Sequence, residues 1–135
     1  MTQRHYLERH FQQDFGKWAR HNLKTTTALE LKVSKTDSLP FSRLEDHQFS
    51  ALKAASGAVG VYHKIADGTM GRKPFDSFYM ARAEAYIVIM YRCTEIGQKE
   101  FFTVSVQAWE TEMVGPRRSL TEDRARAIGY AYFLA

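Results

Sequence analysis

A carboxylate and an ammonium group stand two residues apart in the tripeptide Glu30-Leu31-Lys32. The surrounding residues, 23–33, are rich in β-branched and apolar side chains, which predicts a strand. Side chains at i and i+2 of a strand point to the same face, so Glu30 and Lys32 are expected to lie together. Two opposite charges on one face of an apolar strand indicate either a lined site or an exposed ion pair. Carboxylate oxygens bind Mg²⁺, and an ammonium group offsets negative charge on a phosphate.

The residues after this tripeptide continue the pattern through Ser38-Leu39-Pro40-Phe41, His47-Gln48 and Leu52. The pattern resembles the core of Holliday-junction resolvases, both the bacterial type related to penicillin-binding-protein-related factor A and the archaeal type. The bacterial enzymes carry a Glu-x-Lys strand, a loop rich in Ser and Thr with a Phe-Pro or Pro-Phe pair, and a helix entered by His-Gln. The resemblance covers residues 29–58 and implies the PD-(D/E)xK nuclease superfamily.

In that superfamily an acid on a neighbouring strand joins the Glu in binding Mg²⁺, and the Lys contacts the attacking water or the scissile phosphate. The resemblance therefore implies that Glu30 is a metal ligand and that Lys32 is catalytic. Mg²⁺ takes oxygen ligands in octahedral geometry, so the backbone carbonyl of Leu31 and a substrate phosphate would complete its shell. Mn²⁺ is expected to substitute for Mg²⁺.

The second acid is where this sequence departs from the family. The family's Asp usually precedes Glu-x-Lys on a hairpin, whereas only a predicted helix and a Thr-rich strand precede Glu30. Asp76 opens a later predicted strand after a Gly-rich loop and is the predicted replacement, which would permute the strand order. The alternative for Asp76 is a turn cap. Asp67 is the second choice, because Asp-Gly more often only forms a turn.

Three further side chains could belong to the site. In the resembled family a Gln at the position of Gln48 lies beside the metal and orients water or phosphate; a surface glutamine is the alternative. Glu8 could add another acid, as first-helix glutamates do in many of these nucleases, or it could be an ordinary solvated residue. His47 has no second His or Cys at zinc spacing, so a capping or packing role is expected.

Positive charge is the expected means of DNA contact. Lys and Arg exceed Asp and Glu by 19 to 15, a net charge of +4 that is compatible with polyanion binding but is also common in other proteins. The cations predicted to meet phosphates are Lys35, Arg72, Lys73 and Arg4. The spacing of several aromatic residues predicts that most of them belong to the core, and a base-stacking platform is the alternative. These residues are Phe41, Phe75, Phe78, Tyr79 and both Trp residues.

Composition limits the class of protein. A length of 135 residues with 44% apolar and 25% charged residues predicts one ordinary globular domain, a single nuclease domain over 1–135. The longest strongly apolar run, 85–91, is far below the about 20 residues that cross a bilayer. No membrane partner and no secretory signal are expected, which makes the cytoplasm the default location, or the host cytoplasm for a phage protein. The single cysteine, Cys93, is predicted to be a small core residue.

The periodicity predicts an α/β chain, more narrowly α+β, with a single mixed sheet flanked by helices and a restriction-endonuclease-like core. Apolar residues at helical spacing predict a helix over 2–21. Ser42 is expected to cap a second helix over 43–56, with Glu45 in a capping box, and Ser119 to cap a last helix that ends at 128. Further strands are expected at 58–65, 75–80, 85–91 and 100–109.

The expected function is Mg²⁺-dependent hydrolysis of DNA phosphodiesters, with branched or junction DNA favoured through the resemblance. A symmetric junction needs two cuts, so a homodimer is expected. One alternative is a nuclease of the same fold that acts on other DNA or on RNA. Another is a non-catalytic nucleic-acid-binding protein that keeps Glu30 and Lys32 as a structural ion pair, and a third is an α+β domain that matches by chance.

Overall fold

A four-stranded mixed sheet forms the centre of the molecule in the computed structural model, which describes residues 8–67 and 72–134. Its strands, in the order β1-β5-β6-β8, are Thr27–Val33, Glu84–Met90, Glu100–Ser105 and Tyr130–Phe133. β1 pairs with β5 in parallel, and the other two pairs are antiparallel. The α+β class and the mixed sheet flanked by helices are as predicted from the sequence, although two small sheets accompany the central one.

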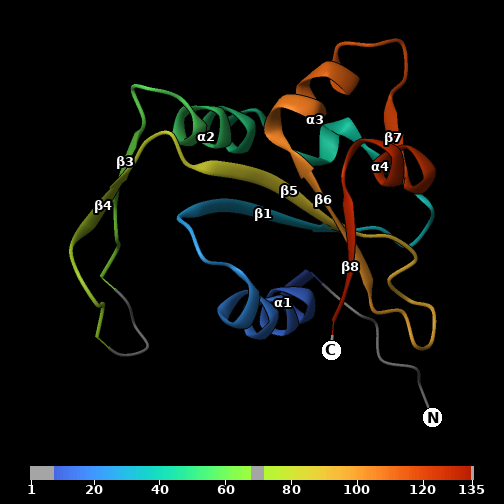
Figure 1. Cartoon of the computed structure of the whole chain (residues 1–135), viewed down its shortest axis with the longest axis horizontal. Coiled ribbons are helices and arrows are strands. Elements are labelled where there is room, and N and C mark those ends of the chain that lie inside the picture. Colours follow the sequence, from blue (N-terminus) through green and yellow to red (C-terminus); the bar gives the residue numbers. More distant parts are fainter. Residues whose placement is uncertain (1–7, 68–71, 135) are drawn as a thin grey trace.

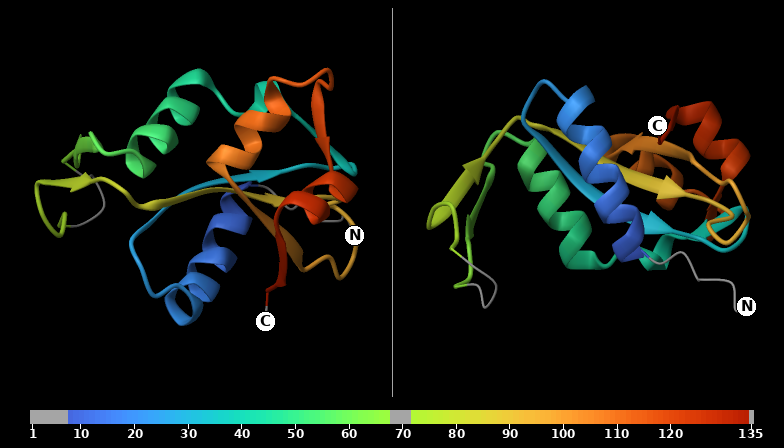
Figure 2. Two further views of the ribbon diagram at one scale, coloured as in Figure 1. Left: turned by 45° about the horizontal axis from the view of Figure 1, so that its top comes forward. Right: turned by 90° about the horizontal axis from the view of Figure 1, so that it is seen from below.

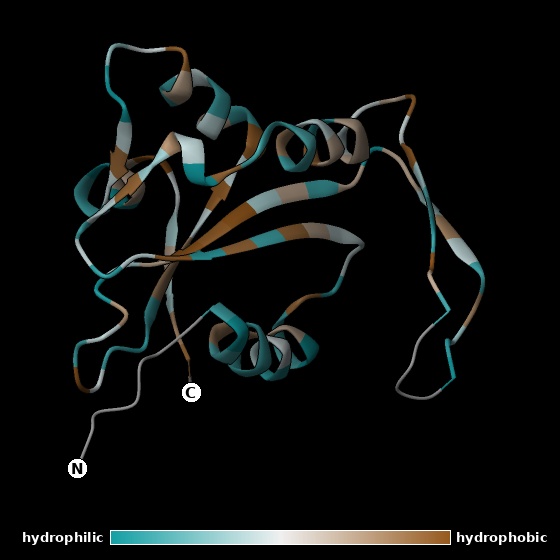
Figure 3. Ribbon diagram, turned by 180° about the vertical axis from the view of Figure 1, so that it is seen from behind, coloured by the Kyte–Doolittle hydropathy of each residue, from teal (hydrophilic) through white to brown (hydrophobic). Residues whose placement is uncertain are grey.

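Helices cover both faces of this sheet (Figures 1 and 2). α1, Glu8–Asn22, lies on one face, and α2, Asp46–Ser56, and α3, Val106–Met113, lie on the other. The sheet therefore separates two apolar clusters, one against α1 and one against α2 and α3. Figure 3 shows apolar colour concentrated on the central strands and hydrophilic colour over much of α1.

The apolar stripe of α1 is as the sequence predicts, within the described part of that helix. Phe11 and Phe15 are buried, and the Trp18 ring meets the Phe101 ring edge to face with 5.0 Å between centroids. The predicted first turn, with Tyr6 and Leu7, lies outside the described residues. Cys93 is buried in the same cluster, which confirms its core role.

The start of α2 differs from the prediction. Phe41–Arg43 forms a 3-10 turn that contains Ser42, and Leu44 then returns to extended backbone. The helix begins at Asp46 with Glu45 as its N-cap, and Glu45 and Gln48 form the capping box. The predicted Ser42 cap is wrong because Ser42 lies inside the 3-10 turn, and the extended residue Leu44 separates that turn from the helix.

Two other predicted boundaries are corrected. The strand expected over 100–109 ends at Ser105, whose hydroxyl accepts a hydrogen bond from Ala108 N at 3.1 Å and caps α3. Ser119 lies in β7, Ser119–Thr121, which pairs with β2, Ser38–Pro40, inside the expected loop. Thr121 instead caps α4, Glu122–Ile128, by accepting from Arg124 N. β8 follows this helix and was not predicted.

A two-stranded antiparallel ribbon projects from one end of the molecule (Figure 1, left). It consists of β3, Val61–Lys64, and β4, Ser77–Met80, and is called the arm below. Because it has only two strands, no second layer covers its outer face, where Tyr62 is 69% exposed. The predictions of a buried strand over 58–65 and of core roles for Phe75 and Tyr79 are therefore wrong. No helix in the described ranges is long and apolar enough to span a membrane.

Candidate functional site

Lys32 is a buried lysine on β1, only 7% exposed. Its ammonium nitrogen lies 3.4 Å from Glu30 Oε1 on the same strand and 3.9 Å from Glu8 Oε1 on α1. Removing an ammonium group from water costs several kcal/mol, which nearby carboxylates offset. Lys32 therefore depends on both acids, and its position draws β1 and α1 together at one charged centre.

Gln48 brings a third element, α2, to this centre. Its side-chain nitrogen donates to Glu30 Oε1 at 2.9 Å, and its side-chain oxygen accepts from Glu45 N at 3.0 Å. The second bond is half of the capping box that begins α2. Because both ends of the amide are engaged, Gln48 fixes the direction in which the Glu30 carboxylate points.

Glu8 has a buried carboxylate oxygen with no hydrogen-bond partner among the described residues. Among the described residues, the Lys32 ammonium nitrogen lies 3.9 Å from this oxygen and also contacts Glu30. A buried oxygen of this kind needs a proton, a water or a cation. Oxygen-only ligands suit Mg²⁺, so the pair of Glu8 and Glu30 fits that ion. Leu31 packs its side chain into the α1 cluster, which leaves its backbone carbonyl as its one possible metal ligand.

The predicted second acids lie at the far end of the arm. Lys73 contacts both, with its nitrogen 2.7 Å from Asp67 and 3.4 Å from Asp76, and their side chains are 92% and 88% exposed. Within the described part of the chain, no group of three or more His, Cys, Asp or Glu side chains is placed to hold a metal. The structure thus gathers Glu8 with Glu30, and leaves Asp76 beside Lys73.

Asp76 lies in a bend just before β4 and is not among the residues that line the pocket containing Glu30. The amide of Ile65 donates to the carbonyl of Asp76, which extends the ladder of the arm by one residue. Within β4, Phe78 and Met80 share one face because side chains at i and i+2 of a strand point the same way. Both of those residues line the pocket that contains Glu30.

This pocket, of about 470 Å³, lies between α2, β1 and the arm. Glu30, Gln48, His47 and His63 supply its polar groups. Apolar side chains from the arm and from α2 supply most of the rest; the lining set is completed by Ala28, Leu29, Ala51, Leu52, Val61, Phe78 and Met80. These lining residues were not predicted from the sequence. Val61 and His63 alternate along β3, which indicates that they share one face of the strand.

No family model, curated protein or solved structure matches the chain. The geometry around Glu30 and Lys32 is therefore the evidence for what this site does.

The predicted DNA-binding cations are spread over the molecule. Lys35 is exposed just after β1, and Arg72 is exposed near the arm. Lys73 forms ion pairs with Asp67 and Asp76, and Arg4 lies outside the described residues. His47 is exposed and lies 3.2 Å from Glu45 at the start of α2. These placements leave Lys35 and Arg72 as the exposed cations of the predicted set.

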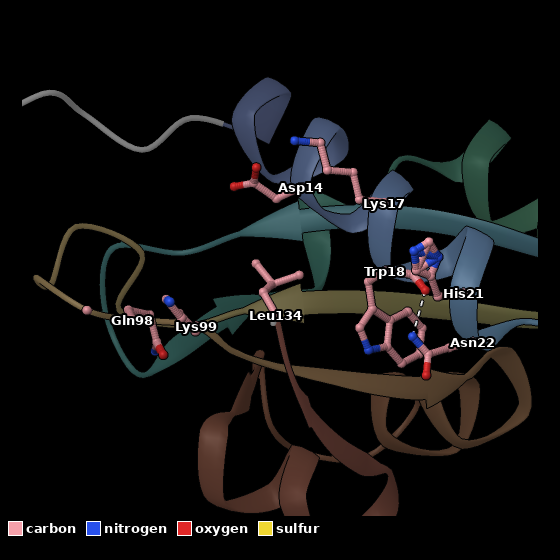
Figure 4. Close-up of a pocket in the computed structure, with 9 residues that line it drawn as sticks. Asp14, Lys17, Trp18, His21, Asn22, Gln98, Lys99 and Leu134 are labelled. Carbon is pink, nitrogen blue, oxygen red and sulfur yellow. Dashed lines mark hydrogen bonds between the residues drawn. The ribbon is translucent and has the colours of Figure 1, made fainter.

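A second hollow, of about 600 Å³, lies beside α1 on the opposite face of the sheet from α2 (Figure 4). Trp18 and Leu134 form part of its wall, and Lys17, His21 and Lys99 place basic groups around it. None of the residues predicted to be catalytic or to bind a metal lines this hollow. The charged centre at Lys32 is therefore the better candidate for chemistry.

Proposed function

We propose that this protein is a Mg²⁺-dependent endonuclease that hydrolyses phosphodiester bonds in DNA, with branched DNA as the favoured substrate. The observation that carries the proposal is the buried Lys32 between Glu30 and Glu8, with Gln48 bound to Glu30. Three elements converge there on one ammonium group and two carboxylates. This is the set of groups that metal-assisted cleavage of a phosphodiester needs.

Each residue has a distinct role in the proposed reaction. Glu30 would hold the metal with a carboxylate oxygen, and Gln48 would keep that carboxylate in place. Lys32 would stabilise the charge that develops on the phosphate, as a preorganised cation in a partly dry site. A bound Mg²⁺ polarises the phosphoryl oxygen and lowers the pKa of its water.

Two acids compete for the role of second metal ligand. Glu8 already lies beside Lys32, and one of its oxygens has no hydrogen-bond partner in the part of the chain that the structure describes. Asp76 is the predicted replacement for the family's upstream acid, and its ion pair with Lys73 is largely exposed, so that pair is worth only about 0–1 kcal/mol. Asp76 can therefore exchange Lys73 for a cation at low cost. The proposal assigns Asp76 as the second ligand and Glu8 as the additional acid.

The substrate and the assembly follow from the same proposal. The resemblance to resolvases favours junction DNA, and two symmetric cuts favour a homodimer. The cytoplasm is the proposed location. Lys35 and Arg72 are exposed cations and are the proposed contacts to DNA phosphates. A nuclease of the same fold that acts on other DNA or on RNA is the alternative within this class.

A non-catalytic nucleic-acid-binding protein is the second candidate, and one observation favours it. The charge of Lys32 is already matched by two carboxylates, so the centre would also be stable as a structural ion pair. In that case Glu30 would have no role in cleavage. The two candidates differ in whether the protein cuts nucleic acid when Mg²⁺ is added.

A cleavage and binding panel separates these candidates. Junction DNA, duplex DNA, single-stranded DNA and RNA would be incubated with wild type and Glu30→Gln, in Mg²⁺ and in EDTA. The proposal predicts Mg²⁺-dependent cutting of junction DNA by wild type and retained DNA binding without cutting by the variant. A wild-type protein that binds but never cuts would establish the non-catalytic alternative.

A further inference from the structure

We infer that the pocket beside Glu30 receives one unpaired nucleobase of the strand that is cut. The inference rests on the proposed function and specifies its substrate as DNA with an unpaired nucleotide beside the scissile phosphate. The starting observation is that an apolar pocket opens directly at the proposed metal ligand. The proposed metal site gives Glu30 and Gln48 a role at this pocket and leaves its apolar walls without one.

The walls of the pocket suit a flat apolar ring. Phe78 and Met80 face it from the arm, and Leu52 faces it from α2. His63 lies opposite Phe78 across the two strands, with 5.5 Å between the ring centroids and 41° between the ring planes. A volume of about 470 Å³ lies within the range of small-molecule sites and admits a single base with part of its sugar.

The polar groups of the pocket match the edge of a base. His47 and His63 stand among the lining residues, and each imidazole can donate and accept hydrogen bonds. Glu30 and Gln48 lie at the same pocket, where the phosphate of the same nucleotide would meet the proposed metal. A pocket that suits a flat ring with a polar edge, next to a proposed phosphate position, therefore fits a nucleotide.

A paired base cannot occupy this space. In a duplex both faces of a base are stacked and its edge is paired, so a base must be unpaired or turned out of the helix before protein can surround it. The energetic cost of unpairing is smallest where the nucleotide is already unpaired, which occurs at branch points, mismatches and single strands. Stacking on aromatic side chains tolerates any base, so structure selectivity without strong sequence preference is expected.

The two faces of the arm provide a matched test. Phe78 lines the pocket, whereas Tyr62 on the neighbouring strand faces outward and is exposed. Cleavage would be measured on two DNA substrates that differ only in whether the nucleotide beside the cut is paired. Wild type and Tyr62→Ala are expected to prefer the unpaired substrate by roughly tenfold, the usual size of one stacking contact, and Phe78→Ala is expected to lose that preference.

A second pair of variants adds a Trp on α2 inside or outside the pocket, and neither removes a core contact. Ala51 is exposed on α2 and lines the pocket, and Ser50 is exposed on the same helix outside the lining set. Ala51→Trp is expected to abolish the preference for the unpaired substrate, and Ser50→Trp to retain it. Thermal melting of all four variants would show that each is folded.

A binding readout makes the inference independent of cleavage. A DNA strand with 2-aminopurine as its unpaired base would be titrated with each protein in EDTA. Its fluorescence is expected to fall on addition of wild type or Ser50→Trp and to stay unchanged on addition of Ala51→Trp. Equal quenching by Ala51→Trp and Ser50→Trp, or equal preference in Phe78→Ala and Tyr62→Ala, would overturn the inference while leaving a cutting enzyme. An absence of cutting by wild type would instead refute the proposed function, and the fluorescence would still decide the pocket.

Discussion

Gln48 donates a hydrogen bond of 2.9 Å to Glu30, a residue 18 positions earlier in the chain. The same amide accepts the backbone N–H of Glu45 and so completes the capping box of α2. One side chain therefore begins a helix and positions the acid of the candidate site. The start of α2 and the geometry at Glu30 are coupled, and a change in one is expected to alter the other.

Substitution of Gln48 tests this coupling. Gln48→Ala removes both bonds and is expected to lower the free energy of unfolding by about 1 kcal/mol through loss of the cap. Cleavage is expected to fall about 10- to 100-fold, because the carboxylate loses its positioning partner. Urea unfolding and single-turnover cleavage would measure the two effects. A variant with the stability loss and wild-type cleavage would show that Gln48 only caps the helix.

Lys32→Met tests the buried charge. The substitution keeps an unbranched side chain, one atom shorter, but leaves Glu30 and Glu8 without the ammonium group that both contact. We expect a loss of about 1–3 kcal/mol in unfolding free energy, below the value for fully buried pairs because both glutamates are about a third exposed. In a double-mutant cycle, Lys32→Met and Glu8→Gln should be non-additive. Additive losses would contradict a direct interaction.

Asp76 and Asp67 form a matched pair at the end of the arm, because both contact Lys73 and both are exposed. Asp76→Asn is expected to abolish cleavage with unchanged stability, because Asp76 is the proposed second metal ligand and its side chain is exposed. Asp67→Asn is expected to retain cleavage. Equal activity of the two variants would remove Asp76 from the site and leave Glu8 as the second acid.

Two glycines predict opposite effects on stability. Gly16 lies inside α1 with open space around an added Cβ, so Gly16→Ala is expected to raise the unfolding free energy by about 0.5–1 kcal/mol. A Cβ at Gly129 would meet the carbonyl oxygen of Thr103 on β6, so Gly129→Ala is expected to destabilise. Thermal melting should move the two midpoints in opposite directions. A shift of both midpoints in the same direction would contradict the close approach of α4 to β6.

Cys93 predicts a pH dependence. Burial raises the pKa of its thiol above the ordinary value, so the folded protein keeps the proton to a higher pH than the unfolded chain does. The unfolding free energy should therefore fall as pH rises above about 8.5, the usual thiol pKa. Reaction with a thiol reagent at that pH should be slow in native protein and fast in urea. Fast native labelling would show that the cluster around Cys93 opens readily.

Local sequence patterns predicted the elements whose signal is local. The spacing of Phe11, Phe15 and Trp18 predicts α1, and the alternation around Glu30 and Lys32 predicts β1. Competing signals failed at 106–109, where apolar residues imply a continued strand but the Ser105 cap begins a helix. The last strand, β8, is short and exposed, so it has no burial pattern to read.

The candidate site was predictable only in part, because some of its contacts are local in the sequence and others depend on tertiary packing. Glu30 and Lys32 are neighbours on one strand, so their contact follows from strand geometry. The contact between Lys32 and Glu8 depends on how α1 packs on the sheet, which local spacing does not encode. The pocket likewise exists only because the arm folds beside α2.

Calorimetric titration of Mg²⁺ into the protein tests the central claim, that the acid beside Lys32 holds a divalent cation. Saturable binding is expected for wild type and for Glu110→Gln, whose glutamate pairs with Lys53 away from the site, and no binding is expected for Glu30→Gln. Equal Mg²⁺ binding by Glu30→Gln and wild type would contradict the claim.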